Sequence, residues 1–231
     1  MKTIGMIGGM SWESSRLYYE IVNREIQKRL GGVHSAKLLL HSFDFDEIAA
    51  LQRGGRWQEA TARMADAGVR LARGGADFLI ICCNTMHLMA DEVEKAAGIP
   101  LLHIADPPGA KIKADGHSRV GLIGSCFTME DDGILKGRLA LRYGIETIVP
   151  AKADAAEIDR VILEELVCGR LLPSSRESYR EIMARLVAAG AEGIILGCTE
   201  IPLLVTPDDA AVPLYDTTAL HAIAAAATAL E

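Results

Sequence analysis

The chain has 231 residues, half of them hydrophobic, with a formal net charge of −7 and with acids and bases scattered along its length. This composition supplies enough apolar residues for a substantial core in one large or two small domains. It excludes the basic stripe of a nucleic-acid-binding protein and, because no apolar run reaches about 18 residues, a membrane-spanning segment. We therefore expect neither a nucleic acid nor a membrane as partner.

The predicted elements alternate between short apolar strands and helices. Ser11 stands where it can cap the first helix. The alternation is typical of βαβ units and predicts an α/β fold with parallel sheets. Strands are expected at 2–8, 36–43, 76–83, 99–106, 118–125, 146–151 and 191–198, and helices over 11–30, 56–74, from the third strand to about 97, 154–168, 175–189 and 216–230.

An internal repeat divides the chain into halves. The stretch "RLARGGADFLIICC" (70–83) matches "RLVAAGAEGIILGC" (185–198) at six of fourteen positions, and "TIGMIGG" (3–9) aligns with "RVGLIGS" (119–125) at almost the same offset. Such a recurrence indicates an internal duplication. We predict two similar Rossmann-like lobes, one formed by residues 1–104 with about 210–231 and the other by residues 105–209.

The five cysteines are Cys82, Cys83, Cys126, Cys168 and Cys198. Their odd number and wide spacing do not fit a disulfide framework, so we expect free thiols in a reducing cytoplasm. No CxxC pair is present and adjacent cysteines are poorly spaced as ligands, so we expect no metal site.

The repeat separates the two adjacent cysteines. It aligns Cys83 with Cys198, whereas Cys82 falls on Gly197. Because side chains alternate along a strand, Cys82 is predicted to be a buried core residue. Cys83 and Cys198 each end a strand, where open parallel sheets bind ligands, and we expect them on opposite walls of one cleft between the lobes. The alternative is that both are inert cysteines at equivalent packing positions.

Two thiols on either side of a substrate suit inversion of a carbon stereocentre. One thiolate removes the α-proton from one face, and the opposite thiol delivers a proton to the other. Thiols fit both tasks because their reference pKa is about 8.5. Without a cofactor, the carbanion has to be stabilised by backbone N–H groups and side-chain donors.

The motifs "GGMSWESS" (8–15), "CNTMH" (83–87), "FTME" (127–130), "SRESY" (175–179) and "GCTEI" (197–201) resemble those of the cofactor-independent aspartate/glutamate racemase family. The resemblance spans nearly the whole chain. It implies lobes related by a pseudo-twofold axis, a homodimer, an amino-acid substrate, and Cys83 and Cys198 as the acid/base pair. It also implies substrate contacts from Met10, Ser11, Gln52, Asn84, Thr85, Ser125, Thr128 and Thr199, while Glu200 either orients the substrate amine or caps a helix.

The chain departs from some aspartate racemases of this family at the groups that hold the distal carboxylate. The segment "FDFDEI" (43–48) lacks an arginine, and Val167 stands where a lysine is expected. Arg53, Arg56 and Arg170 are candidate substitutes. Both thiols are present, so we expect reversible racemisation.

Other interpretations compete with this one. A related isomerase of the maleate isomerase or hydantoin racemase type, or a non-catalytic small-ligand binding protein, shares the same features. The glycines of "GMIGGMS" fail the dinucleotide fingerprint. For His87 we favour a structural or capping role over that of a base, and we expect Cys126 and Cys168 to be packing or surface thiols.

Overall fold

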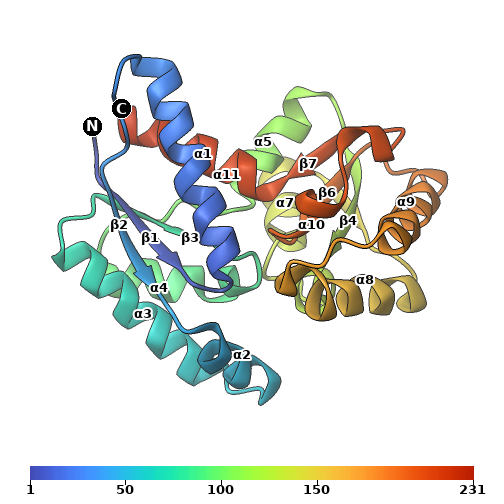
Figure 1. The fold of residues 1–231 in the computed structure, drawn as a ribbon, viewed down its shortest axis with the longest axis horizontal. Helices are drawn as coiled ribbons and strands as arrows, with labels where there is room; N and C mark the ends of the chain where they lie inside the picture. Colours follow the sequence, from blue (N-terminus) through green and yellow to red (C-terminus); the bar gives the residue numbers. More distant parts are fainter. The chain divides into compact units, whose positions relative to one another are not determined.

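The structure is a computed structural model that describes all 231 residues. The chain divides into two compact units, unit 1 with residues 1–104 and 221–231 and unit 2 with residues 105–220. Each unit has helices packed around a parallel sheet, so the predicted α/β fold is confirmed (Figure 1). The sequence analysis began the returning segment near residue 210, whereas residues 210–220 group with unit 2.

Unit 1 is built around a three-stranded sheet of order β2-β1-β3. Both strand pairs are parallel. Its elements are β1 (Ile4–Gly8), α1 (Trp12–Leu30), β2 (Leu38–Ser42), α2 (Phe45–Arg53), α3 (Trp57–Arg73), β3 (Phe78–Ile81), the 3-10 helix η1 (Thr85–Met89), α4 (Ala90–Ala97) and the larger part of α11 (Thr217–Leu230).

The sheet of unit 1 is covered on both faces, which explains why β1 and β3 are apolar at nearly every position. One face packs against buried residues of α1 and against the alanines of α11, including Ala222 and Ala226. The other face packs against α2, α3 and α4, through residues such as Leu51, Met64 and Val93. A strand buried on both faces has no polar side, as parallel sheets require.

Unit 2 is built around a four-stranded parallel sheet of order β5-β4-β6-β7. Helices α8 and α9 pack against β4, α7 against β5 and α5 against β7. Its elements are α5 (Asp106–Ala114), β4 (Arg119–Gly124), α6 (Cys126–Glu130), α7 (Lys136–Tyr143), β5 (Glu146–Ile148), α8 (Lys152–Glu164), η2 (Leu166–Cys168), α9 (Pro173–Ala188), β6 (Ile194–Gly197), α10 (Ile201–Leu204), η3 (Pro207–Asp209) and β7 (Leu214–Asp216).

The two sheets share one topology. In each, the first strand lies between the second and the third, and all pairs are parallel. The sheets differ in their fourth strand. In unit 2, β7 pairs with β6 over three residues. In unit 1, the equivalent segment makes only an isolated bridge between Leu79 and Leu101. The shared order is the expected result of a duplication.

Two local predictions were wrong. Residues 99–106 do not form a regular strand, because after two backbone bonds that join Leu79 to Pro100 and Leu102 the chain turns toward α5. Ser11 occupies the N-cap position of α1, but its side chain makes no capping hydrogen bond. No helix in the structure combines the length and the apolar character needed to cross a membrane.

Candidate active site

The adjacent cysteines of unit 1 face opposite sides of their sheet. Cys82 is fully buried in the core against α1 and α11, while Cys83 is partly exposed and packs against the core on the α3 side. Burial raises the pKa of the Cys82 thiol, and its neighbour Cys83 raises it further. The prediction that Cys82 is a core residue is therefore confirmed, and a thiol held this way is inert.

The turn after Cys83 is a 3-10 helix that a histidine holds in place. Asn84 and Thr85 are buried, and η1 leads directly into α4. His87 Nδ1 lies 2.8 Å from the carbonyl oxygen of Cys83, so Nδ1 carries the proton and donates. The imidazole thus bonds back to the turn that carries the thiol, as a capping residue does.

His87 belongs to a buried histidine cluster. Its ring lies 4.7 Å from that of His103 and 5.7 Å from that of His221, between centroids. His221 donates from Nε2 to the carbonyl of Leu102 at 2.9 Å and accepts from the Tyr18 hydroxyl at Nδ1, also at 2.9 Å. Burial, followed by the charges of His103 and His221, lowers the pKa of His87 well below its ordinary value. His87 is therefore neutral at pH 7. No group of His, Cys, Asp and Glu side chains in the chain is arranged to hold a metal ion.

The loop after β1 lies at the same end of the sheet as Cys83, since Ile7 pairs with Ile81. Gly9 has a φ of 87°, and a side chain there would strike the backbone of Phe43, so only glycine fits. Met10 and Ser11 follow and are both buried.

Gln52 joins α2 to the cysteine turn of unit 1. Its Nε2 lies 3.1 Å from the Met86 sulfur in η1. Met10 and Met86 belong to the same buried core. The structure therefore gathers the candidate residues of the first half, Met10, Gln52 and the Cys83 turn, around one end of the sheet of unit 1.

The cysteine turn of unit 2 carries a buried carboxylate. Cys198 follows β6 directly and is partly exposed, while Thr199 and Glu200 are buried. The Cys198 thiol donates to Glu200 Oε2 at 3.0 Å, and the Thr199 hydroxyl donates to the same oxygen at 2.7 Å. In this contact the sulfur of Cys198 is the donor and the carboxylate oxygen of Glu200 is the acceptor.

Ser125 and Thr128 lie beside this turn, because Gly124 pairs with Gly197 across β4 and β6. Ser125 caps α6 by accepting from the Thr128 N–H at 3.4 Å, and the two hydroxyls lie 3.1 Å apart. The candidate residues of the second half therefore gather at one end of the sheet of unit 2.

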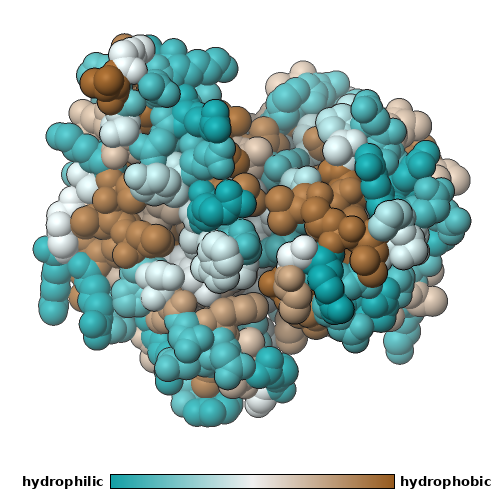
Figure 2. Space-filling model, viewed as in Figure 1, coloured by the Kyte–Doolittle hydropathy of each residue, from teal (hydrophilic) through white to brown (hydrophobic).

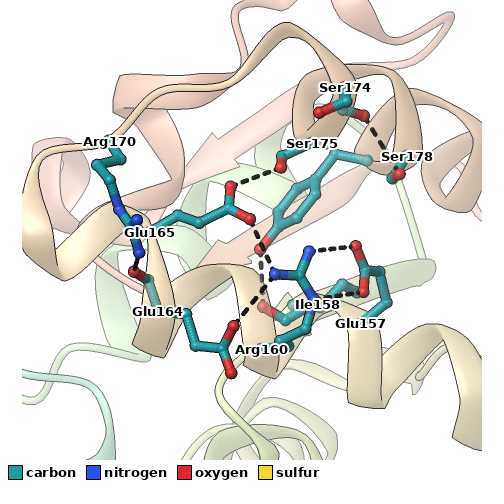
Figure 3. Close-up of polar contacts among 10 residues, drawn as sticks. Glu157, Ile158, Arg160, Glu164, Glu165, Arg170, Ser174, Ser175 and Ser178 are labelled. Carbon is teal, nitrogen blue, oxygen red and sulfur yellow. Dashed lines mark hydrogen bonds and ion pairs between the residues drawn. The ribbon is translucent and has the colours of Figure 1, made fainter.

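A network that sequence reasoning missed supports this end of unit 2. Glu165 is 5% exposed and accepts from the Ser175 hydroxyl at 2.5 Å and from Arg160 at 2.9 Å (Figure 3). The Ser175 bond first, and Arg160 after it, lower the pKa of Glu165. The carboxylate ties the first turn of α9 to η2, the segment that contains Val167.

The rest of the "SRESY" motif completes this support. Arg176 donates to Asp209 at 2.8 Å, and chiefly for that reason the pKa of Asp209 falls to about 2. Tyr179 donates to the carbonyl of Ile158 at 3.0 Å, and burial, followed by the charge of Cys198, raises its pKa. The motif thus anchors η2, η3 and α8 around the cysteine turn. Its buried serine is a signal from which a polar partner such as Glu165 could have been sought, but the sequence analysis did not single out Glu165.

The comparison with known families gives the geometry its context. The model of the Asp/Glu/hydantoin racemase family matches residues 7–225. The chain belongs to this family. A Yersinia pestis protein assigned to the Asp/Glu racemases has a crystal structure that is 48% identical, with a TM-score of 0.94 and complete coverage of both chains. The structure of an aspartate racemase homologue from Pyrococcus horikoshii is 33% identical, with a TM-score of 0.84 over the whole of both chains.

Among curated relatives, the broad-specificity amino-acid racemase RacX of Bacillus subtilis is 23% identical over 236 residues, which cover 98% of each chain. Glutamate racemases also match, but the chain spans only about half of their length. The family members that match thus act on different amino acids, which leaves the substrate of this racemase-family chain to be argued from its own residues.

Three arginines were candidate binders of a distal carboxylate. Arg53 lies 3.5 Å from Asp46, Arg56 is paired with Glu59 in α3, and Arg170 donates to the backbone carbonyl of Glu164. Each therefore has a partner within its own unit. Of the remaining thiols, Cys126 is partly exposed, with a pKa raised to about 11 by burial and by Asp159, and Cys168 is exposed.

Proposed function

We propose that this chain is a cofactor-independent amino-acid racemase in which Cys83 and Cys198 exchange the roles of base and acid. One observation carries the proposal: the two partly exposed thiols directly follow the third strands of two sheets with the same strand order. The membership of the chain in a racemase family supports the same reaction. The mechanism requires the two thiols to reach opposite faces of one α-carbon.

The reaction runs in two proton transfers. The thiolate of one cysteine takes the α-proton and becomes a thiol, which leaves a carbanion whose charge spreads into the substrate carboxylate. The thiol of the other cysteine then gives its proton to the opposite face and becomes a thiolate. The net result is an inverted stereocentre and exchanged protonation of the two sulfurs, so that no other reactant is consumed.

The two cysteines have different neighbours for this task. Because the Cys198 thiol donates to the Glu200 carboxylate, we propose that Cys198 starts as the acid and Cys83 as the base. Thr199 holds the same carboxylate oxygen and so orients it. Asn84, Thr85, Met10 and Ser11, together with Gln52, Ser125 and Thr128, are the proposed substrate contacts, where amide and hydroxyl donors stabilise the developing charge on the substrate carboxylate.

The substrate class we propose is α-amino acids without the need for an acidic side chain. Val167 in η2 is an uncharged residue at the position where a lysine was expected, and Arg53, Arg56 and Arg170 are engaged by other groups. The broad specificity of the relative RacX agrees with this assignment. Aspartate and glutamate remain within the class, but we expect neutral amino acids to be racemised at comparable or higher rates.

The experiment that tests the proposal is incubation of the protein in D2O with single enantiomers of the common amino acids. Chiral chromatography measures the opposite enantiomer, and mass spectrometry measures deuterium at the α-carbon. We expect both products to appear together without added cofactor. Maleate and hydantoins belong in the same panel, because conversion of these alone would indicate a different isomerase.

The matched control uses the neighbouring cysteines. Cys83→Ser and Cys198→Ser should each lose racemisation by about 10²-fold or more, the usual contribution of a positioned acid or base. Cys82→Ala, one residue from Cys83 but on the other face of the sheet, should retain it. Full activity in both serine variants would overturn the two-thiol mechanism.

A further inference from the structure

A groove with a volume of about 810 Å³ lies within unit 2, where α8 and the segments that follow β4 and β5 line it. Small-molecule sites in proteins usually have volumes of about 300 to 1,000 Å³, so the groove is large enough for a ligand. One face of α8 contributes to it, because the lining residues of this helix recur at helical spacing. They include Lys152, Ala155, Ala156, Asp159 and Leu163.

Apolar side chains from two other segments complete the groove. Val149 and Pro150 follow β5, and Met129 belongs to α6. Val149 is 40% exposed, and Leu163 of α8 is 55% exposed. The visible surface of α8 in Figure 2 is mainly hydrophilic, as is usual for a helix in contact with water. The exposed apolar side chains of the groove are an exception, and a bound ligand would cover them.

Two oppositely charged groups that form no ion pair lie on the α8 face of the groove. Lys152 has no anionic partner, and Asp159 accepts from the Cys126 N–H at 2.8 Å but has no cationic partner. An α-helix rises about 1.5 Å per residue, so the seven positions between these groups correspond to about 10 Å along the helix axis. The small side chains of Ala155 and Ala156 lie between them. The groove therefore presents a cation and an anion at a fixed spacing, with an apolar floor.

The groove is separate from the candidate active site, although both use α6. Cys126 and Met129 of this helix line the groove. Thr128 instead faces β6, since a Cβ on Gly197 would lie 3.2 Å from its Cγ2. Neither catalytic cysteine and none of the proposed substrate contacts lines the groove. It lies beyond the end of β5, an edge strand, whereas Cys198 follows β6, an inner strand of the same sheet.

We propose that this groove binds a short linear peptide with free ends and an apolar side chain. The N-terminal ammonium of the peptide pairs with Asp159 and its C-terminal carboxylate with Lys152, while the apolar side chain lies over Ala155 and Ala156. An extended chain spans about 3.3 to 3.6 Å per residue, so three residues match the spacing of the two charges. A single amino acid carries both of its charges on one carbon atom, so it pairs with only one of the two groups.

Isothermal titration calorimetry of the full chain with the tripeptide Ala-Leu-Ala tests the proposal. We expect one saturable site per chain. The same peptide with an acetylated N-terminus and an amidated C-terminus keeps the apolar side chain but loses both charges, and it should bind at least about tenfold more weakly, as should free leucine. Equal binding of the blocked peptide would overturn the role of the charges. Equal binding of leucine would overturn the choice of a peptide.

Three substitutions in α8 locate the site. Lys152→Ala and Asp159→Asn should each weaken binding by about tenfold, since each removes one charge. Asparagine keeps an oxygen that accepts from the Cys126 N–H, so the link to α6 remains. Ala156→Trp, at an exposed position, should abolish binding because the indole fills the groove. Lys113→Ala removes an exposed lysine of α5 outside the groove and is the matched control.

The catalytic cysteine provides a second control. Cys198→Ser should bind the tripeptide as the wild type does, because the groove does not include the cysteine turn. Circular dichroism checks that each variant is folded. The proposal is overturned by a lack of saturable binding at millimolar concentrations, by binding that all three α8 variants leave unchanged, or by binding that Cys198→Ser abolishes. Racemisation is not measured in this test, so failure here is distinct from failure of the proposed function.

Discussion

The cysteine turns of the two units have the same backbone plan but different polar support. Each cysteine directly follows the third strand of a parallel sheet. In unit 1 a neutral histidine, His87, bonds back to the carbonyl of Cys83. In unit 2 a carboxylate, Glu200, accepts from the thiol of Cys198, and the carboxylates of Glu165 and Asp209 hold the surrounding segments. Duplication kept the thiols and the strands, while the groups around them diverged.

Because their polar support differs, the two turns should lose stability in different pH ranges. Protonation of a buried neutral histidine opposes folding below the ordinary histidine pKa of about 6.5. The carboxylates of unit 2 have lowered pKa values, so they support folding until the pH falls below about 4. Unit 1 should therefore loosen at a higher pH than unit 2 on acidification.

The largest expected effect is on racemisation, and it should distinguish the two thiols by the enantiomer on which each one acts. In D2O, Cys83→Ala and Cys198→Ala should each lose racemisation by 10²- to 10⁴-fold. Each should retain slow α-proton exchange with one enantiomer only, and the two variants should select opposite enantiomers. Mass spectrometry of each enantiomer after incubation measures this directly.

The opposite selectivity is the informative part of this prediction. Loss of exchange with both enantiomers in either variant would mean that the thiols do not act on separate faces. Cys126→Ala is a suitable control, because Cys126 lies at the start of α6 and has a pKa raised to about 11.

A second prediction concerns the position where the repeat differs, Cys82 in unit 1 and Gly197 in unit 2. A Cβ on Gly197 would lie 2.8 Å from Leu122 Cδ1 and 3.2 Å from Thr128 Cγ2. Gly197→Cys should therefore reduce the free energy of unfolding by about 3 kcal/mol through overpacking. Cys82→Gly should reduce it by about 2 kcal/mol through an unfilled cavity and added chain entropy. Urea unfolding measures the free energy of unfolding of both variants. If Gly197→Cys left this free energy unchanged, the two cysteine turns would accept the same residue at this position.

The sequence alone was sufficient to predict the central strands of both sheets and the different environments of Cys82 and Cys83. Apolar runs between glycines predicted β1, β3, β4 and β6. The internal repeat, together with period-two alternation, separated the core thiol Cys82 from Cys83. These features depend on local pattern, which is why they are visible without the structure.

The support around the thiols could not be predicted, because it depends on contacts distant in sequence. His221 reaches the cluster of His87 from a helix that begins more than 100 residues later. The sequence analysis did not single out Glu165, because its bond to Ser175 joins residues ten positions apart in different helical segments. The segment 99–106 had the pattern of a strand, but only a single bridge forms there, because strand length is set by pairing and not by hydropathy.

The third prediction uses the histidine cluster of unit 1. The pKa of His87 is lowered in the folded state, so the unfolded state binds its proton first as the pH falls below about 6.5. Stability is complete above pH 6.5 and should decrease below it by about 1.4 kcal/mol per pH unit for this one group. The titratable groups that face it are His103 and His221, with Tyr18 bonded to the latter.

His87→Phe keeps a ring in this place but removes the proton-binding nitrogen. Its stability between pH 7 and pH 5 should vary less than that of the wild type, although it loses the bond to the Cys83 carbonyl. His34→Phe, on the exposed turn after α1, should keep the wild-type slope. Identical slopes for all three proteins would show that the cluster does not titrate on unfolding.

The smallest expected effect tests the carboxylate support of unit 2. Ser175→Ala removes one donor from buried Glu165 while Arg160 remains, so we expect a loss of roughly 1 kcal/mol in the free energy of unfolding. The neighbouring Ser174→Ala, at an exposed residue, should change it by less than about 0.5 kcal/mol. Because Glu165 stays ionised to low pH, the difference between the two variants should persist at pH 5, where the histidine contribution of unit 1 has already begun to fall. A difference that disappears between pH 7 and pH 5 would mean that both turns depend on the same titrating groups.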